Sequence, residues 1–350
     1  MSRPCPRAVL LLLLALGCAG LRADLVPDLN AVRLPVPDRS AAALADARRE
    51  GLEVALLRLS GERAALAHPE IAAALRRPQR YLVQYSYRDD GEDGDDGLSL
   101  RLEYDAPALR GLLRAAGLPL WTANRPPVLT FLVVNDGRQR RFASAAELPA
   151  AGAALRAQFR RRGLPLRLPL YDLQDRLALP LGAAWRQDSA ALVDAALRYD
   201  EDVLLAGRVA RLSDGRWLGD WRILQAGRWQ VEPVSADSLA DFAAAGADLA
   251  ARSLVARYAV VAAADGDLRL RVAVEGIADF AAYRRVRGLL QALEPVDRVA
   301  AERVEAGRVL LRLESAAQAE PLARIIELDP RFQRRAAAPG EAALRYRWRE

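Results

Sequence analysis

The chain has 350 residues, a net charge of +6, one histidine and two cysteines. All 51 basic residues are arginine, and the absence of lysine excludes a Walker-type phosphate loop, which needs that residue. Without residues 1–23, which carry three arginines and no acid, the charge falls to +3, which argues against electrostatic binding of nucleic acid or anionic lipid.

The first 23 residues have the composition of a secretory signal peptide. Arg3 and Arg7 precede an apolar run at residues 8–16, and the small-residue pattern of residues 21–23 predicts cleavage before Asp24. The apolar run is well short of the roughly 20 residues that cross a bilayer. We therefore expect export to the periplasm and no integral membrane span in the mature chain.

Cys18 opens an alternative to simple cleavage. Residues 15–18 (ALGC) resemble a bacterial lipobox, in which the cysteine carries the lipid, so an outer-membrane lipoprotein anchored through Cys18 is the second interpretation. Cleavage after Ala23 instead removes both cysteines, and the remaining 327 residues then contain no thiol.

The first predicted domain covers residues 24–120. Apolar side chains recur with a helical period over residues 40–61, where Ser40 is placed as the N-cap and Gly61 as the C-cap. The other expected elements are a strand at 29–38, a short helix at 69–76, a hairpin of 81–88 with 98–105, and a helix at 106–116. Three prolines in residues 118–127 predict a linker.

The second predicted domain, residues 126–264, alternates strands with helices, which predicts a partly parallel sheet. Its first strand, 128–136, is a continuous apolar run typical of a strand buried on both faces. The further strands are expected at 164–172, 202–212, 216–225 and 227–233, and the helices at 145–162, 188–199 and 238–262.

The third predicted domain, residues 267–350, has the order β-α-β-β-α-β, which is the ferredoxin-like arrangement. Its last strand, ALRYRWRE at 343–350, alternates apolar with arginine side chains, and this period of two predicts one buried and one solvated face. The fold class is therefore α/β and α+β, in three small mixed domains.

Four segments carry a family resemblance: residues 74–88 (ALRRPQRYLVQYSYR), 117–129 (GLPLWTANRPPVL), 168–179 (LPLYDLQDRLAL) and 196–212 (ALRYDEDVLLAGRVARL). They resemble the proteobacterial exported family catalogued as domain of unknown function 2066. Residues 196–209 are also similar, more loosely, to an element of periplasmic domains such as the N-terminal domain of the translocation protein TolB and curli-secretion lipoproteins. The first family carries no assigned activity, so the resemblance implies export and fold rather than mechanism.

The strongest catalytic candidates are Asp172 and Asp175, which follow an expected strand at the sheet edge where α/β proteins bind ligands. Their spacing of three places both on one face if this segment forms a helical turn. Paired carboxylates do acid–base work when their environments separate their pKa values, but an N-capping aspartate beside an ion pair explains the same residues.

The acidic run and the single histidine are further candidates for a functional site. Asp93, Asp95 and Asp96 lie in the acidic run 89–97 and are calcium candidates, although no EF-hand register fits and a solvated hairpin loop explains the run. His68 precedes a proline at a predicted helix start, and a lone histidine there is expected to be a surface or capping residue.

The sequence contains no cofactor-binding motif, and none of the candidate residues forms a recognisable catalytic motif. The looser similarity to TolB-type and curli-secretion domains implies assembly or scaffolding work, so we expect a bacterial, non-enzymatic periplasmic protein that binds or scaffolds other cell-envelope proteins through protein–protein interaction. No nucleic acid and no cofactor are expected. The alternative is a periplasmic enzyme that uses Asp172 and Asp175 in a cleft.

Overall fold

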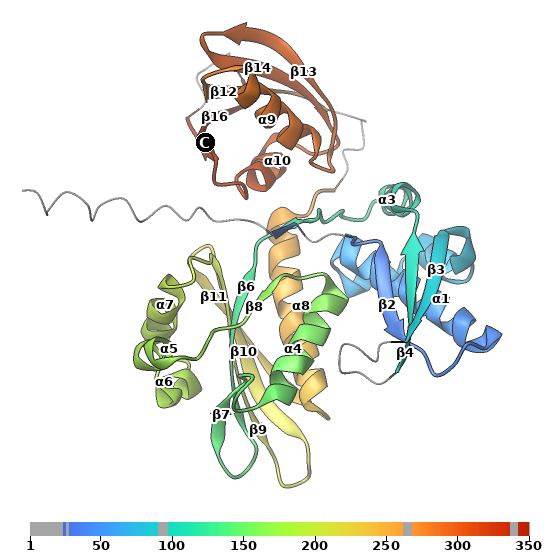
Figure 1. Cartoon of the computed structure of the whole chain (residues 1–350), viewed down its shortest axis with the longest axis vertical. Helices are drawn as coiled ribbons and strands as arrows, with labels where there is room; N and C mark the ends of the chain where they lie inside the picture. Colours follow the sequence, from blue (N-terminus) through green and yellow to red (C-terminus); the bar gives the residue numbers. More distant parts are fainter. Residues whose placement is uncertain (1–23, 26–27, 90–96, 262–267, 337–341, 350) are drawn as a thin grey trace, which may run out of the picture.

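The computed structural model describes residues 24–25, 28–89, 97–261, 268–336 and 342–349. These residues form three units, each with its own sheet, joined around the long helix α8, Leu239–Tyr258 (Figure 1). The fold class predicted from the sequence, a mixed α/β and α+β chain, is confirmed. In the part of the chain that the structure describes, no helix is both long and apolar enough to cross a bilayer.

The first unit is a three-stranded antiparallel sheet covered on one face by helix α1, Ala41–Ser60. Strand order is β2-β4-β3, with β2 at Ala31–Pro35, β4 at Leu98–Tyr104 and β3 at Leu82–Asp89. Around α1 lie η1 (Arg63–Ala67), α2 (Pro69–Leu75), η2 (Pro78–Arg80) and α3 (Ala106–Ala115). Ser40 and Gly61 cap α1 as predicted, since Ser40 accepts from the Ala43 N–H and Gly61 adopts the left-handed conformation.

The central unit is built on a six-stranded sheet in the order β11-β10-β9-β6-β7, with β8 also beside β6. Strand β6, Val128–Asn135, runs parallel to β9, Val203–Arg211, and to β8, Leu166–Arg167, and the other pairs are antiparallel. The remaining strands are β7 (Arg140–Phe142), β10 (Trp217–Gln225) and β11 (Arg228–Ala236).

Both faces of β6 are buried, as the apolar run predicted. Leu132 points into a core formed with α4 (Pro149–Arg162) and α8, whereas Phe131 points into a second core on the opposite face. That second core is covered by α5 (Leu173–Ala178), α6 (Leu181–Arg186) and α7 (Ser189–Leu197). Figure 1 shows the two helical layers on opposite sides of the sheet.

The segment predicted as a strand at 164–172 is mostly irregular, because only Leu166–Arg167 pairs with β6. Pro165 and Pro169 have no N–H to donate to a ladder, and Tyr171 has a φ of 53°. The regular spacing of its leucines produced the wrong prediction. Helix α6 was not predicted, and for α5 the sequence indicated only a helical turn that holds Asp172 and Asp175.

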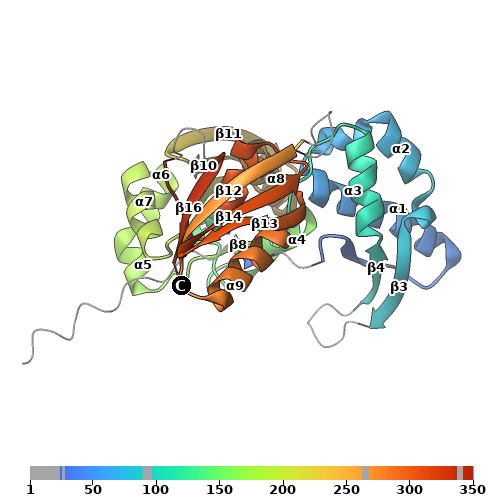
Figure 2. The same ribbon diagram turned by 90° about the horizontal axis from the view of Figure 1, so that it is seen from above.

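The third unit follows the predicted order β-α-β-β-α and then departs from it. Its elements are β12 (Leu268–Ile277), α9 (Phe280–Gln291), β13 (Val296–Glu305), β14 (Gly307–Ser315) and α10 (Ala319–Ile326), followed by β15 (Phe332–Arg334) and β16 (Leu344–Trp348). The sheet order is β13-β14-β12-β16-β15, and Figure 2 looks onto it from above. The alternation predicted for the last strand is confirmed, because Leu344, Tyr346 and Trp348 are buried.

The difference from a ferredoxin-like order lies in strand β15, which the sequence did not indicate. β15 runs antiparallel to β16, and β16 runs parallel to β12, so the chain turns once more after α10 and inserts its last strand beside β12. Phe332 is the single apolar residue of this short strand, and its ring packs against Tyr346 and Trp348. Three residues are too few for a readable period of two.

The predicted linker at 118–127 is a tightly packed junction rather than an exposed connection. Trp121 and Arg125 are fully buried, and Leu120 forms a bridge to Val260 through two backbone hydrogen bonds. Asn124–Arg125 also forms the short strand β5, paired with β1 at Asp24–Leu25. The prolines exclude a helix here, as expected, but they do not keep the segment in solvent.

Three arginines, Arg58, Arg125 and Arg162, hold the first two units together, and we call them the arginine junction. Arg125 donates to the carbonyl oxygens of Arg58 and Gly163, at 2.7 Å each. Arg58 donates to the Arg160 carbonyl at 2.9 Å, and Arg162 to the Gly61 carbonyl at 2.9 Å. The carbonyl-bearing ends of α1 and α4 thus receive cationic donors from the other unit, which satisfies orphan acceptors and complements both helix dipoles.

Candidate functional site

Asp172 and Asp175 lie together at the start of α5, as their spacing predicted. Asp172 is the N-cap of α5 and accepts from the Asp175 N–H at 3.1 Å. Arg198, just after α7, binds both oxygens of Asp172 at 2.7 and 2.8 Å and one oxygen of Asp175 at 3.0 Å. The other oxygen of Asp175 accepts from the Tyr171 N–H at 2.7 Å and the Tyr199 hydroxyl at 2.6 Å.

This cluster has the properties of a structural clamp between α5 and α7. The guanidinium of Arg198 lowers the pKa of Asp172 to about 2, so this carboxylate is ionised throughout the physiological range. Burial, together with the hydrogen bond to Asp175, raises the pKa of Tyr199 to about 12. Both carboxylates are already engaged by donors, an arrangement that suits capping and charge pairing better than proton transfer.

The clamp predicts a pH-dependent contribution to stability. A carboxyl whose folded-state pKa is depressed stabilises the fold above its ordinary value of 3.8, and that contribution is lost as the pH falls toward 2. The variant Asp172→Asn keeps a capping side chain and removes the charge. We expect its urea midpoint to lie below that of the wild type at neutral pH and to converge with it on acidification.

The matched control for this measurement is Asp194→Asn. Asp194 is exposed on α7 and has no ion pair among the described residues. Its urea midpoint should follow that of the wild type at every pH. An Asp172→Asn difference that persists unchanged at pH 2 would contradict the assignment of the clamp.

Exposed apolar side chains lie on the same two helices and just before α5. Leu170, Leu173, Leu177 and Leu197 are each exposed by more than two thirds, and Val193 is 39% exposed. Leu173 and Leu177 are one helical turn apart on α5, as are Val193 and Leu197 on α7, so each pair shares a face. We call these five residues the leucine surface.

The clamp fixes the two helices that carry the leucine surface. Arg198 ties the start of α5 to the end of α7, and the Leu170 N–H donates to the Tyr199 hydroxyl at 2.9 Å. The inner sides of the helices are anchored by Leu179 and Leu192, which are nearly inaccessible in the core. Figure 1 shows α5 and α7 side by side at the end of the central unit opposite the first unit.

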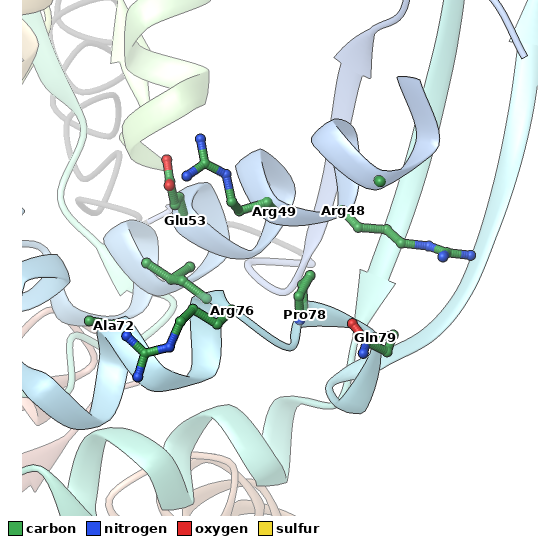
Figure 3. Close-up of a pocket in the computed structure, with 9 residues that line it drawn as sticks. Arg48, Arg49, Glu53, Ala72, Arg76, Pro78 and Gln79 are labelled. Atoms are coloured by element: carbon green, nitrogen blue, oxygen red, sulfur yellow. The ribbon is translucent and has the colours of Figure 1, made fainter. Parts of the chain in front are cut away.

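An arginine-lined groove lies in the first unit, between α1 and the segment α2–η2. The cavity has a volume of about 730 Å³ and is lined by Ala45, Arg48, Arg49, Glu53, Ala72, Leu75, Arg76, Pro78 and Gln79. Figure 3 shows Arg49 on the α1 wall, Arg76 on the opposite wall, and Arg48 extending from α1 toward the strands. We call this cavity the arginine groove.

The remaining predicted site residues do not join either surface. His68 caps α2, its Nδ1 accepting from the Glu70 N–H at 3.3 Å, which confirms a capping histidine. Cys18 and the calcium candidates Asp93, Asp95 and Asp96 lie outside the described residues, so they stay predictions. Within the described ranges, no group of three or more His, Cys, Asp or Glu side chains is arranged to hold a metal ion.

Sequence reasoning missed both surfaces. The predicted strand at 164–172 includes Leu170, and no apolar face was predicted on α5, although the spacing of Leu173 and Leu177 by four residues fits one face of a helix. The arginines of the groove come from two segments that are brought together only by the packing of α2 against α1. Their charge was visible in the sequence, but their shared position was not.

Comparison with known families gives one match. A family model described as a domain of unknown function, DUF8605, matches residues 23–122. No curated protein matches the chain. The matched segment is the first unit, and it contains the whole arginine groove.

Proposed function

We propose that the protein is an exported, non-enzymatic binding or scaffolding protein of the bacterial cell envelope. It holds a partner protein through the leucine surface on α5 and α7. The observation that carries this proposal is that four leucines on or beside two contacting helices, α5 and α7, are each more than two thirds exposed. Monomeric proteins rarely leave a contiguous apolar patch of more than a few hundred Å² in water, and larger patches mark interaction sites.

The surroundings of the patch fit a protein interface. Arg176, Arg198 and Asp172 are charged and partly exposed at its border, giving an apolar centre with a polar rim. The network that surrounds Asp175 fixes the backbone of both helices, so little conformational entropy remains to be lost when a partner binds. The partner surface is therefore apolar at its centre and carries charged groups at its margin.

The test is photo-crosslinking in the cell envelope of the organism that encodes the protein. A benzophenone amino acid replaces Leu173 or Leu197 in the full chain, and Val304 serves as the matched control. Val304 is 68% exposed and apolar, but it lies on β13 in another unit. We expect crosslinks to an envelope protein from both leucine positions, with a yield clearly above that at Val304.

A second variant separates specific docking from general stickiness. Leu177→Glu places a charge in the centre of the surface, where it is 72% exposed and carries little folding energy, and it should abolish the crosslinks at Leu173. Equal yields at all three positions, or crosslinks only between copies of the chain, would overturn the proposal. So would turnover of a small molecule by the purified protein with no crosslinked partner.

A further inference from the structure

The arginine groove carries a net positive charge, because three arginines and one acid line it. Among the residues that the structure describes, no carboxylate lies within ion-pair distance of Arg48, Arg49 or Arg76, and Glu53 is the single acid in the lining. The Nε of Arg48 is buried and has no hydrogen-bond acceptor in the described part of the chain. A buried donor without an acceptor costs free energy.

The neighbouring strand β3 leaves one of its edges unpaired. It pairs with β4 on one side and has no second strand partner within the described ranges. It is eight residues long, and Val83 is 63% and Tyr85 44% exposed. An exposed edge strand with apolar side chains is a template for pairing with another chain.

Arg48 joins these two features into one surface. It lines the groove, and its guanidinium lies 5.3 Å from the centre of the Tyr85 ring. Tyr85 pairs with the buried Leu102 and therefore lies on the sheet face that α1 covers. Beyond it, Arg39, which also pairs with Asp89 of β3 at 3.3 Å, lies 5.5 Å from the centre of the Tyr87 ring on the same face.

We propose that β3 and the arginine groove bind an extended acidic peptide segment of another protein. The segment adds to the free edge of β3, and alternate carboxylates project onto the face that carries Arg48 and Arg39. Its end nearest η2 enters the groove between Arg49 and Arg76. Backbone hydrogen bonds supply affinity along the strand, and the arginines select carboxylates at every second position. This site is independent of the leucine surface.

The probe is a fluorescein-labelled ten-residue peptide of alternating Glu and Val, with an otherwise identical Gln–Val peptide as its control. Binding to the full chain is followed by fluorescence polarisation. We expect the Glu–Val peptide to bind and the Gln–Val peptide to bind at least tenfold more weakly, with affinity falling as salt is added. The double variant Arg48→Gln/Arg76→Gln should lower the affinity at least tenfold, whereas Arg114→Gln should leave it unchanged, because Arg114 is exposed on α3 outside the groove.

Hydrogen exchange separates strand addition from simple anion binding. The peptide should slow exchange of amides in β3, and inorganic phosphate at the same occupancy should not. The proposal fails if the Glu–Val peptide does not bind at about 1 mM, if binding ignores the arginine variants, or if binding leaves the β3 amides unprotected. Full displacement of the peptide by millimolar phosphate would instead identify a site for small anions and would also overturn it.

Discussion

Replacing Arg125 by methionine is expected to lower the free energy of unfolding by about 3–5 kcal/mol. This is the largest effect that we predict for a residue between two units. Arg125 is fully buried, and burial lowers its pKa to about 9. Methionine retains the unbranched stem but donates no hydrogen bond. The carbonyls of Arg58 and Gly163 would then be left without their donors, and each unsatisfied buried acceptor costs about 1–3 kcal/mol.

The size of this effect depends on the kind of partner that Arg125 has. Where a buried arginine pairs with one carboxylate, both can be replaced by apolar side chains at little cost. The partners of Arg125 are backbone carbonyls, at the ends of α1 and α4 and in its own segment, and no substitution removes them. The guanidinium also stacks on Trp121, 3.7 Å from its ring centre, so shape and charge are lost together.

The measurement is urea unfolding of the Arg125→Met variant beside Arg114→Met, whose exposed side chain should change stability by less than about 0.5 kcal/mol. Limited proteolysis supplies a second readout. If the junction holds the units together, residues 118–127 of Arg125→Met should be cleaved at urea concentrations that leave the wild type intact. A variant within 1 kcal/mol of the wild type and equally resistant to protease would show that the carbonyls find other donors.

The contrast between the predicted linker and the observed junction shows which contacts a local sequence pattern can predict. The caps of α1 and the burial of β6 were predictable, because Ser40, Gly61 and the apolar run each act on neighbours in sequence. The bonds of Arg125 to Arg58 and Gly163 cross 67 and 38 residues. No periodic pattern in the sequence indicates contacts over that range. The prolines therefore predicted a linker at 118–127, and the burial of Arg125 was not predicted.

The candidate site was predictable to a similar degree. The sequence placed Asp172 and Asp175 on one helical turn and offered capping as one of two interpretations, and the capping geometry is present. It gave no indication of Arg198 and Tyr199, which determine what those carboxylates do and which lie 23 to 26 residues away. The free edge of β3 could not be predicted either, since the alternation of Val83, Tyr85 and Tyr87 is that of an ordinary half-buried strand.

The core of the central unit gives the second large prediction, because Trp221 of β10 occupies a slot between two glycines. It is fully buried, stacks on Phe242 at 5.0 Å and donates from its indole nitrogen to the Phe242 carbonyl at 2.8 Å. A Cβ added at Gly207 of β9 would lie 2.4 Å from its ring, and one added at Gly246 of α8 would lie 2.5 Å from it. We expect Trp221→Ala to cost about 3–5 kcal/mol.

Two glycine-to-alanine substitutions test the close packing around Trp221 while the indole is retained. Gly246 and Gly111 both lie inside helices, so alanine should favour helix formation at each by up to about 1 kcal/mol. Nothing lies within 4 Å of a Cβ at Gly111, so Gly111→Ala should be neutral or stabilising. Gly246→Ala must instead displace the indole, and overpacking of this kind costs about 1–3 kcal/mol.

The decisive step is a double-mutant cycle between positions 246 and 221. Trp221→Leu vacates the part of the slot that the new methyl group needs, so adding Gly246→Ala in that background should cost little or restore stability. The coupling energy from urea unfolding should be at least about 1 kcal/mol, as expected for residues in direct contact. If Gly246→Ala is as harmless as Gly111→Ala in the wild type, the close approach of α8 to β10 is absent in solution, and the face of the sheet beneath α8 packs differently.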